Sequence, residues 1–238
     1  MIKKFNNELQ AKAVADSLGL LMTKHEGVYI VSNSKEEMLT KFNLGYYDEG
    51  DIFYDKELFE VDDDGFMVIR DTALVDASSI KLPYGIRDCS YMFYECIHLE
   101  IPPIIPKGVQ CCDSMFKGCT SLKKAPTIPK GVKDCSGMFE GCTALKTPPK
   151  IPEGAKDCSY MFYKCCSLEV TPKIPEGVKD CSYMFTGCVS LEVPPIIPES
   201  AEYYACILSG CISLKKHPHF PENCDTIDAL QGTSFNKA

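Results

Sequence analysis

Cys158-Ser159-Tyr160-Met161-Phe162 recurs along this chain at a spacing of 23 residues. The same five residue types begin again at Cys89 and Cys181, and close variants begin at Cys112 and Cys135. A second cysteine, a leucine and a proline keep the same phase in every copy: Cys96, Cys119, Cys142, Cys165, Cys188 and Cys211; Leu99, Leu122, Leu145, Leu168, Leu191 and Leu214; Pro106, Pro129, Pro152, Pro175, Pro198 and Pro221. A fixed period of this length, with no insertion, predicts a solenoid of stacked repeats.

The count gives six full repeats over 89–226, with capping half-repeats at 81–88 and 227–238. One unit cannot bury its own apolar face, so the Met, Phe, Leu and Cys columns should fill an interior shared by successive coils. We expect Ser-x-Met-Phe-x-x-Cys to form about two helical turns, with Ser90 or Asp113 as N-cap. The Pro-x-Ile-Pro segment should be extended, and a turn should follow it at Gly108 and its equivalents.

One family shares these motifs. Met115-Phe116-Lys117-Gly118-Cys119-Thr120-Ser121-Leu122, followed by Ile128-Pro129-Lys130-Gly131-Val132, resembles the BspA-like class of leucine-rich repeats, which are also 23 residues long. The resemblance covers about residues 80–230 and implies an α/β-class fold, a right-handed solenoid of the leucine-rich-repeat type. It also implies an interaction or adhesion module, often on cell surfaces. Two features depart from the family: Met stands before Phe where the family has Ala, and the Ile-Pro pair comes one residue later.

Residues 1–80 differ from the repeats in composition and in pattern. They hold 8 Lys+Arg and 16 Asp+Glu, a net of −8, which equals the formal charge of the whole chain. Residues 81–238 are therefore neutral overall, and so sharp a shift predicts two domains, 1–80 and 81–238. No repeat occurs in the first of them.

Local patterns predict a small α+β fold for this acidic N-terminal domain. Apolar spacing favours a helix over 7–18 and a strand over 28–31. Capping-box spacing from Ser34 favours a second helix through Phe42. Residues 57–61 and 66–70 flank an acidic turn, as in a hairpin.

Composition excludes several classes of function. A net charge of −8 disfavours nucleic-acid binding, which usually leaves a basic footprint. No stretch approaches the roughly 20 apolar residues of a membrane span. The first residues do not resemble a secretory signal, and the fifteen cysteines suit a reducing compartment, so we predict a cytoplasmic protein.

The chemistry-bearing residues do not form a recognisable catalytic or metal site. Cys-x6-Cys is not a zinc spacing, so we interpret the cysteines as small buried hydrophobes, with Cys111 and Cys166 as candidates for exposure. Glu60-x-Asp62-x-Asp64-Gly65 echoes a calcium loop, but a solvated acidic turn explains it as well. The four histidines are scattered, and no triad or phosphate loop is present. We therefore predict no enzyme activity, no cofactor, no metal and no small-molecule ligand.

Positions that vary within a strict repeat are where recognition can be encoded, although drift at solvated positions explains such variation equally well. Four columns vary: the two after the leucine, a third of Ile104, Thr127, Lys150, Lys173, Ile196 and His219, and a fourth of Tyr94, Lys117, Glu140, Tyr163, Thr186 and Ser209. The exposed candidates for partner binding are the two columns after the leucine, namely Glu100, Lys123, Lys146, Glu169, Glu192 and Lys215, then Ile101, Lys124, Val170, Val193 and Lys216, together with Asp48, Asp51 and Asp55 in the acidic domain. Ile101, Val170 and Val193, with Ile104 and Ile196, would join into an apolar stripe typical of interaction sites.

These features predict a non-catalytic module that binds a protein through one repeat face and the acidic domain. A sharper hypothesis is an inhibitor of a host defence enzyme, encoded by a phage or mobile element, whose acidic domain occupies a nucleic-acid-binding groove. Two alternatives stay open. One is a bacterial surface adhesin of the BspA-like type. The other is an enzyme with its site among Asp48, Asp51, Asp55 and Asp71 and the solenoid as targeting arm.

Overall fold

The structure is a computed structural model, and it describes residues 2–18, 21–25, 28–32, 44–47, 52–55, 57–221 and 228–235. The chain forms two compact units, Met1–Arg70 with Leu82–Arg87 and Asp71–Lys81 with Asp88–Ala238. We call them the N-terminal unit and the repeat stack. The predicted boundary near residue 80 falls where the two units interleave along the chain. No helix in the described ranges has the length and apolarity that crossing a bilayer requires.

The N-terminal unit begins with a helix on a three-stranded sheet. Strand β1 (Ile2–Phe5), β2 (Leu21–His25) and β3 (Val28–Ser32) form an antiparallel sheet in the order β1-β3-β2. Helix α1 (Glu8–Leu18) contacts all three strands. The helix predicted over 7–18 is present, and the side-chain oxygen of Asn7 accepts the N–H of Gln10 at 3.3 Å, as an N-cap does.

Two hairpins complete the described part of this unit. Strand β4 (Leu44–Tyr47) pairs with β5 (Ile52–Asp55), and β6 (Phe59–Val61) pairs with β7 (Met67–Ile69), both antiparallel. The second is the hairpin that the sequence predicts. Its turn is held by Asp62, whose carboxylate accepts the N–H of Phe66 at 2.7 Å. The helix predicted from Ser34 to Phe42 lies outside the described residues.

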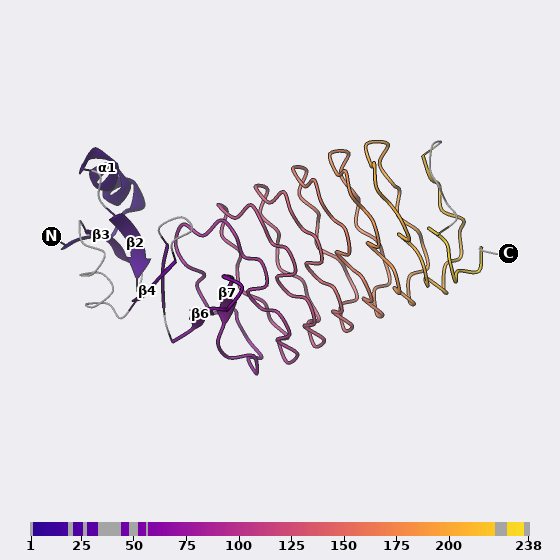
Figure 1. Ribbon diagram of the computed structural model, residues 1–238, viewed down its shortest axis with the longest axis horizontal. Coiled ribbons are helices and arrows are strands. Elements are labelled where there is room, and N and C mark those ends of the chain that lie inside the picture. The colour runs from indigo at the N-terminus through magenta and orange to yellow at the C-terminus, as the bar shows by residue number, and fades with distance from the viewer. Residues whose placement is uncertain are drawn as a thin grey trace. The chain divides into compact units, whose positions relative to one another are not determined.

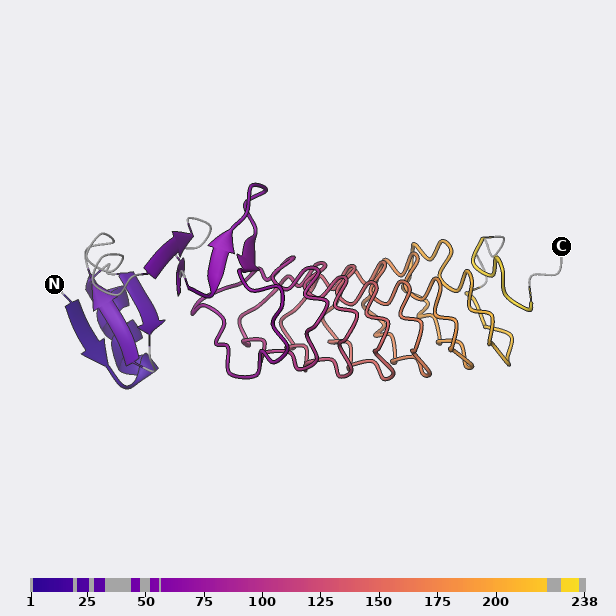
Figure 2. The ribbon, with the colours of Figure 1, turned by 90° about the horizontal axis from the view of Figure 1, so that it is seen from below.

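The repeat stack is a series of coils in register at one repeat length. Parallel bridges join equivalent positions of successive coils: Asp88 to Cys111, Cys111 to Asp134, Asp134 to Asp157, Asp157 to Asp180, and Asp180 to Tyr203. Figures 1 and 2 show the coils following one another side by side from the segment after β7 to the C-terminal end. This is a leucine-rich-repeat-type fold in which the backbone of each coil forms hydrogen bonds with the backbones of the neighbouring coils.

The helix predicted at Ser-x-Met-Phe-x-x-Cys is wrong. In its place alternate N–H groups point to different partners: that of Phe93 donates to Met115 in the next coil at 2.9 Å, whereas that of Tyr94 donates back to Tyr91 at 2.8 Å. An α-helix would need each N–H to donate to the carbonyl four residues earlier in the same coil. Ser90 caps nothing helical, since its hydroxyl donates to Asp88 at 2.6 Å.

Two positions in every coil adopt the left-handed backbone conformation, which stops helix propagation. In the first coil they are Tyr91, with φ of 58°, and Glu95, with φ of 55°. The equivalent positions elsewhere also have positive φ: Ser114, Gly137, Tyr160, Tyr183 and Cys206, then Gly118, Gly141, Lys164, Gly187 and Gly210. Left-handed geometry is disfavoured for L-residues with a Cβ, so glycine is frequent in the second column.

The interior columns are buried as predicted. The Met, Phe and Leu side chains of the central coils have no exposed surface, and the phenylalanine rings stack from coil to coil with centroids 5.8 Å apart between Phe116 and Phe139. The second cysteine column is buried too, and it does more than fill space. The thiol of Cys142 donates to the carbonyl of Phe116 at 3.2 Å, and this contact recurs along the stack.

The expected turn after the proline segment is also present. The N–H of Val109 donates to the carbonyl of Pro106 at 3.2 Å, and the same bond recurs in the next four coils. The preceding Pro-x-Ile-Pro residues have no helix or strand pairing. Each coil therefore reverses direction at a fixed place, which keeps its outer positions in straight columns.

Candidate interaction surface

The structure places all eleven repeat residues that were predicted to bind a partner at the surface. Ten are exposed and Glu100 is half-exposed. Together with Thr147 they form two neighbouring columns, which we name the charged column (Glu100, Lys123, Lys146, Glu169, Glu192 and Lys215) and the mixed column (Ile101, Lys124, Thr147, Val170, Val193 and Lys216).

The charged column is ordered by ion pairs between adjacent coils. Lys123 lies 2.8 Å from Glu100, Lys146 lies 3.1 Å from Glu169, and Lys215 lies 2.7 Å from Glu192. The six residues thus form three pairs with no member left over. Each partner is largely solvated, so each pair adds little stability, about 0–1 kcal/mol. The column instead holds a fixed pattern of charge signs along the stack, and the sequence alone had not shown this pairing.

The apolar stripe predicted beside it is broken in two. Ile101 and Ile104 lie in the first coil, whereas Val170 lies three coils later, with Lys124 and Thr147 between them in the mixed column. Ile104 is 80% exposed. A continuous apolar contact surface of the kind first expected is therefore not formed.

A groove lies over the first to fourth coils of the stack, along the variable column of Tyr94, Lys117, Glu140 and Tyr163; the sequence had marked this column as variable but had not predicted a groove. Its volume is about 150 Å³, and it is lined by Tyr94, Glu95, Lys117, Gly118, Glu140, Gly141, Tyr163 and Lys164. Tyr94 stands at one end and Tyr163 at the other. The signal that could have revealed it is the pair of glycines, Gly118 and Gly141, in a column where the first and fourth coils carry Glu95 and Lys164.

Local contacts fix the groove's walls. Lys117 lies 3.1 Å from Glu140 in the next coil, and Lys164 lies 5.0 Å above the ring of Tyr163. Burial lowers the pKa of Lys117, but the hydrogen bond and charge of Glu140 outweigh it and leave that pKa raised. A hydrogen bond to Glu95 raises the pKa of Tyr94. Both shifts favour the protonated form, so Lys117 is a cation and Tyr94 a neutral phenol at neutral pH.

Tyrosines gather beyond both ends of the groove. Tyr91 packs against Tyr94 edge to face, with ring centroids 5.9 Å apart. At the other end Tyr160 stacks on Tyr183 at 4.7 Å and tilts against Tyr163 at 5.6 Å. Tyrosine offers a large, rigid contact surface and a polar hydroxyl, which is why it is enriched at protein interfaces.

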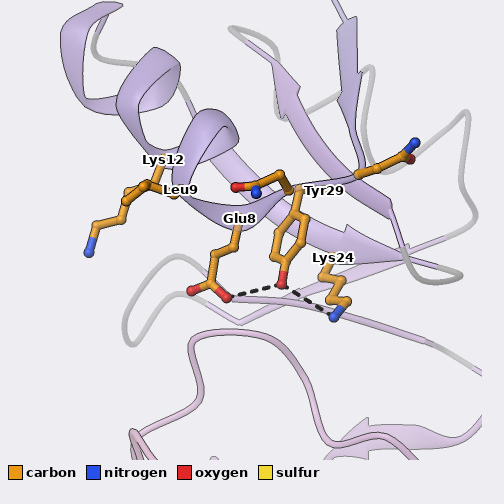
Figure 3. Close-up of a pocket in the computed structure, with 7 residues that line it drawn as sticks. Glu8, Leu9, Lys12, Lys24 and Tyr29 are labelled. Atoms are coloured by element: carbon orange, nitrogen blue, oxygen red, sulfur yellow. Dashed lines mark hydrogen bonds between the residues drawn. The ribbon is translucent and has the colours of Figure 1, made fainter.

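The N-terminal unit has a larger hollow, of about 600 Å³, at the start of α1 (Figure 3). There the hydroxyl of Tyr29 donates to Glu8 at 3.0 Å, and Lys24 donates to that hydroxyl at 3.3 Å. The hydroxyl of Tyr84 donates to the other carboxylate oxygen of Glu8 at 3.1 Å. These groups satisfy one another, so the cluster ties α1 to the sheet.

The acidic candidates of the N-terminal unit do not assemble a site among the residues that can be placed. Asp48 and Asp51 lie outside the described residues, and Asp55 ends β5, where its side chain is not described. Asp71 accepts the N–H of Ala73 at 3.0 Å. In the described ranges no three His, Cys, Asp or Glu side chains are grouped to hold a metal ion.

Burial keeps several of the cysteine thiols protonated. It raises the pKa of Cys96 and Cys211 to about 12, and it raises the pKa of fully buried Cys142 well above the ordinary value of a thiol. Cys111 and Cys166, the two predicted outside the ladders, are half-buried, and so is Cys206. Burial also raises the pKa of Cys111, to about 11.

Comparisons with known proteins agree with this architecture. A family model described as the BspA type leucine rich repeat region, in six copies, matches residues 72–168 and 114–236. A leucine-rich repeat protein from Bacteroides ovatus is 22% identical with a TM-score of 0.54, over 75% of this chain and 56% of that one.

Two further solved structures align less closely. A leucine rich cell surface protein from Faecalibacterium prausnitzii is 21% identical, with a TM-score of 0.47, over 72% of this chain and 40% of that one. The leucine rich repeat protein of T. pallidum is also 21% identical, with a TM-score of 0.45, over 70% of this chain and 97% of that one. A search of curated proteins gives no match. The chain thus spans little more than half the length of the Bacteroides protein, whose likeness concerns the fold alone.

Proposed function

Since the chain belongs to the BspA-type leucine-rich repeat family, we propose that it is a non-catalytic module that binds a protein partner through the charged and mixed columns of its repeat stack. We take the coils to form a right-handed solenoid of six full repeats, capped by 81–88 and 227–238 and preceded by a small α+β domain.

The observation that carries this proposal is the order of signs in the charged column. From Glu100 to Lys215 the signs run minus, plus, plus, minus, minus, plus, and three ion pairs between coils hold them in place. Strict stacking sets the side chains about 4.8 Å apart per coil. A partner with the opposite order of charges would be selected in register, because complementary charges give specificity more than raw affinity.

The acidic N-terminal part is the second contact in this proposal. Residues 1–80 carry the whole net charge of −8, with Asp48, Asp51 and Asp55 among its acids. A net charge of this size attracts a basic partner surface over about one Debye length, some 8–10 Å at ordinary ionic strength.

We place this work in the cytoplasm, because fourteen described cysteines are unpaired thiols and such thiols persist in a reducing compartment. The rival location is the cell surface, where an adhesin of the BspA-like type would act. A phage-encoded inhibitor of a defence enzyme draws no support from the structure or the comparisons, and we leave it out of the proposal.

Affinity capture with the full chain tests the proposal. The bait is wild-type protein, incubated with a lysate of the organism that encodes it, against a double variant, Lys146→Glu with Glu169→Lys. The exchange keeps an ion pair at this place but inverts its sign, so stability should change by less than about 1 kcal/mol. We expect the captured protein to bind the variant about tenfold more weakly.

A matched control is the exchange Lys179→Glu with Glu202→Lys, an ion pair between neighbouring coils in another column. It should leave capture unchanged. Equal loss in both variants, or turnover of a substrate by the chain with no protein captured, would overturn the proposal in favour of the enzyme alternative.

A further inference from the structure

We propose that the groove over Gly118 and Gly141 is the docking site for an extended peptide segment of the partner. The segment carries a basic and an acidic residue four or five positions apart, the first at Glu95 and the second at Lys164. This inference rests on the proposed function: it adds to the two columns a separate site on the same stack and names the chemistry of the partner segment that this site recognises.

The groove exists because two adjacent coils lack the side chains that their neighbours carry. Position for position, Gly118 and Gly141 stand where the first and fourth coils have Glu95 and Lys164. Ser114 and Gly137 likewise stand where those coils have Tyr91 and Tyr160. The backbone of Gly118 and Gly141 therefore forms the floor of the groove, and Tyr94 and Tyr163 bound its two ends.

Its size suits a peptide rather than a cofactor. A volume of about 150 Å³ is below the ~300–1,000 Å³ of typical small-molecule pockets. It accepts one or two small side chains, such as proline or valine, between aromatic walls. Aromatic-lined grooves recognise extended and proline-rich segments in this way.

The two ends have opposite charge, and their separation sets the spacing in the ligand. Glu95 and Lys164 lie three coils apart, about 14 Å at a coil spacing of ~4.8 Å. An extended chain advances ~3.3 Å per residue, so its two charged residues should be separated by four or five positions. Between the ends, Lys117 and Glu140 neutralise each other at 3.1 Å. The middle of the segment therefore needs no charge.

Selection from a displayed library of random 12-residue peptides tests this spacing on the full chain. The wild type should enrich peptides with one basic and one acidic residue four or five positions apart. Glu95→Lys should enrich two acidic residues at that spacing, and Lys164→Glu two basic residues. These expectations hold whichever way the peptide runs. The same motif in all three selections, or no preferred spacing, would overturn the inference.

Filling the floor gives a second test. Gly141→Lys places a long side chain in the groove, whereas Gly210→Lys places one in the same column outside it. The two sites match closely: φ is 72° and 73°, and an added Cβ would lie 3.7 Å and 3.6 Å from the Cα of the preceding glycine in the column. Gly141→Lys should weaken a selected peptide at least tenfold, and Gly210→Lys less than twofold. Equal effects would reject the groove.

The outcomes separate this inference from the proposed function. If Lys146→Glu with Glu169→Lys weakens the captured partner while Gly141→Lys does not, the proposed function stands and the groove is not the docking site. If Gly141→Lys abolishes peptide binding but no partner depends on either column, the groove binds peptides and the proposed contact surface is wrong.

Discussion

Phe139 sits at the centre of the repeat stack, and its surroundings show how single residues carry the fold. Its ring has no exposed surface and lies between those of Phe116 and Phe162, with centroids 5.8 Å and 5.7 Å away. Burial of this column could be predicted from sequence, because an apolar residue repeated at a fixed period must face a shared interior.

Phe139→Ala should therefore destabilise the protein by about 3–5 kcal/mol, the cost of a large cavity in a packed core. Urea unfolding followed by circular dichroism measures this. Ile104→Ala is the control: its side chain is 80% exposed, and the change should stay within about 0.5 kcal/mol. A loss below about 1 kcal/mol for Phe139→Ala would mean that the Phe column is not the core.

Thiol reactivity is a second property of single residues. Cys111, Cys166 and Cys206 are half-buried, whereas the other described cysteines are buried. Among the described cysteines, these three should react first with maleimide at pH 8, because labelling needs both access and thiolate. Cys111 should be slow even so, since burial raises its pKa to about 11. Mass spectrometry of labelled peptides would show this, and early labelling of Cys142 would contradict it.

At the scale of elements, the sequence correctly predicted the positions of the turns after the prolines. It wrongly predicted helices at the Ser-x-Met-Phe-x-x-Cys segments, which are turns hydrogen-bonded from coil to coil. Pro106 and its equivalents marked a reversal correctly, because proline restricts its own backbone and that of its neighbour. Nothing in Tyr91 or Ser114 signals a left-handed conformation, since neither is glycine. Bonds from each coil to the next hold those residues there, and single-repeat patterns do not reveal bonds between repeats.

The buried cysteine ladder should make the protein unstable in alkali. Burial holds the folded-state pKa of Cys96 and Cys211 at about 12, against about 9 when unfolded. The folded state thus keeps protons that the unfolded state releases between these values. The stability that these protonated thiols contribute is therefore fully present below pH 9 and is lost as the pH rises toward 12.

Removing one thiol should flatten this decline. In Cys165→Ala the unfolding free energy should fall less steeply between pH 9 and 11 than in the wild type, by up to about 1.4 kcal/mol per pH unit. Urea titrations at several pH values give the slope. The control is Ile104→Ala, which removes an exposed side chain that carries no ionisable group and should leave the slope unchanged. An equal slope in Cys165→Ala and wild type would show that this thiol ionises normally in the folded state.

The ion pairs of the charged column should contribute little to stability. Lys146 and Glu169 are 67% and 58% exposed, so Lys146→Ala should change the unfolding free energy by less than about 1 kcal/mol. Thermal unfolding at 50 mM and 500 mM salt is the measurement, with Glu169→Ala and the double variant completing the cycle. An interaction energy above about 2 kcal/mol between Lys146 and Glu169 would indicate that the charged column serves to stabilise the fold and not to recognise a partner.

For the whole molecule, the sequence predicted the repeat count and the exposure of the charged and mixed columns, because both follow from a period of 23 residues. It did not predict that Glu100 pairs with Lys123 or that Gly118 and Gly141 open a groove. Both depend on which coils are neighbours and where each side chain points. The apolar residues of the predicted stripe are exposed, but Lys124 and Thr147 separate Ile101 from Val170, and this interruption follows from the period of 23 residues itself.

Lysine acetylation footprinting of the captured complex tests partner binding most directly. Full-length protein is acetylated with and without its partner, and each site is quantified by mass spectrometry. We predict protection of Lys123, Lys124, Lys146, Lys215 and Lys216 when the partner is bound, with Lys107 and Lys130, in another exposed column, labelled equally in both states. Protection confined to lysines of the N-terminal unit, such as Lys12 and Lys24, or unchanged labelling throughout, would contradict binding through the repeat stack.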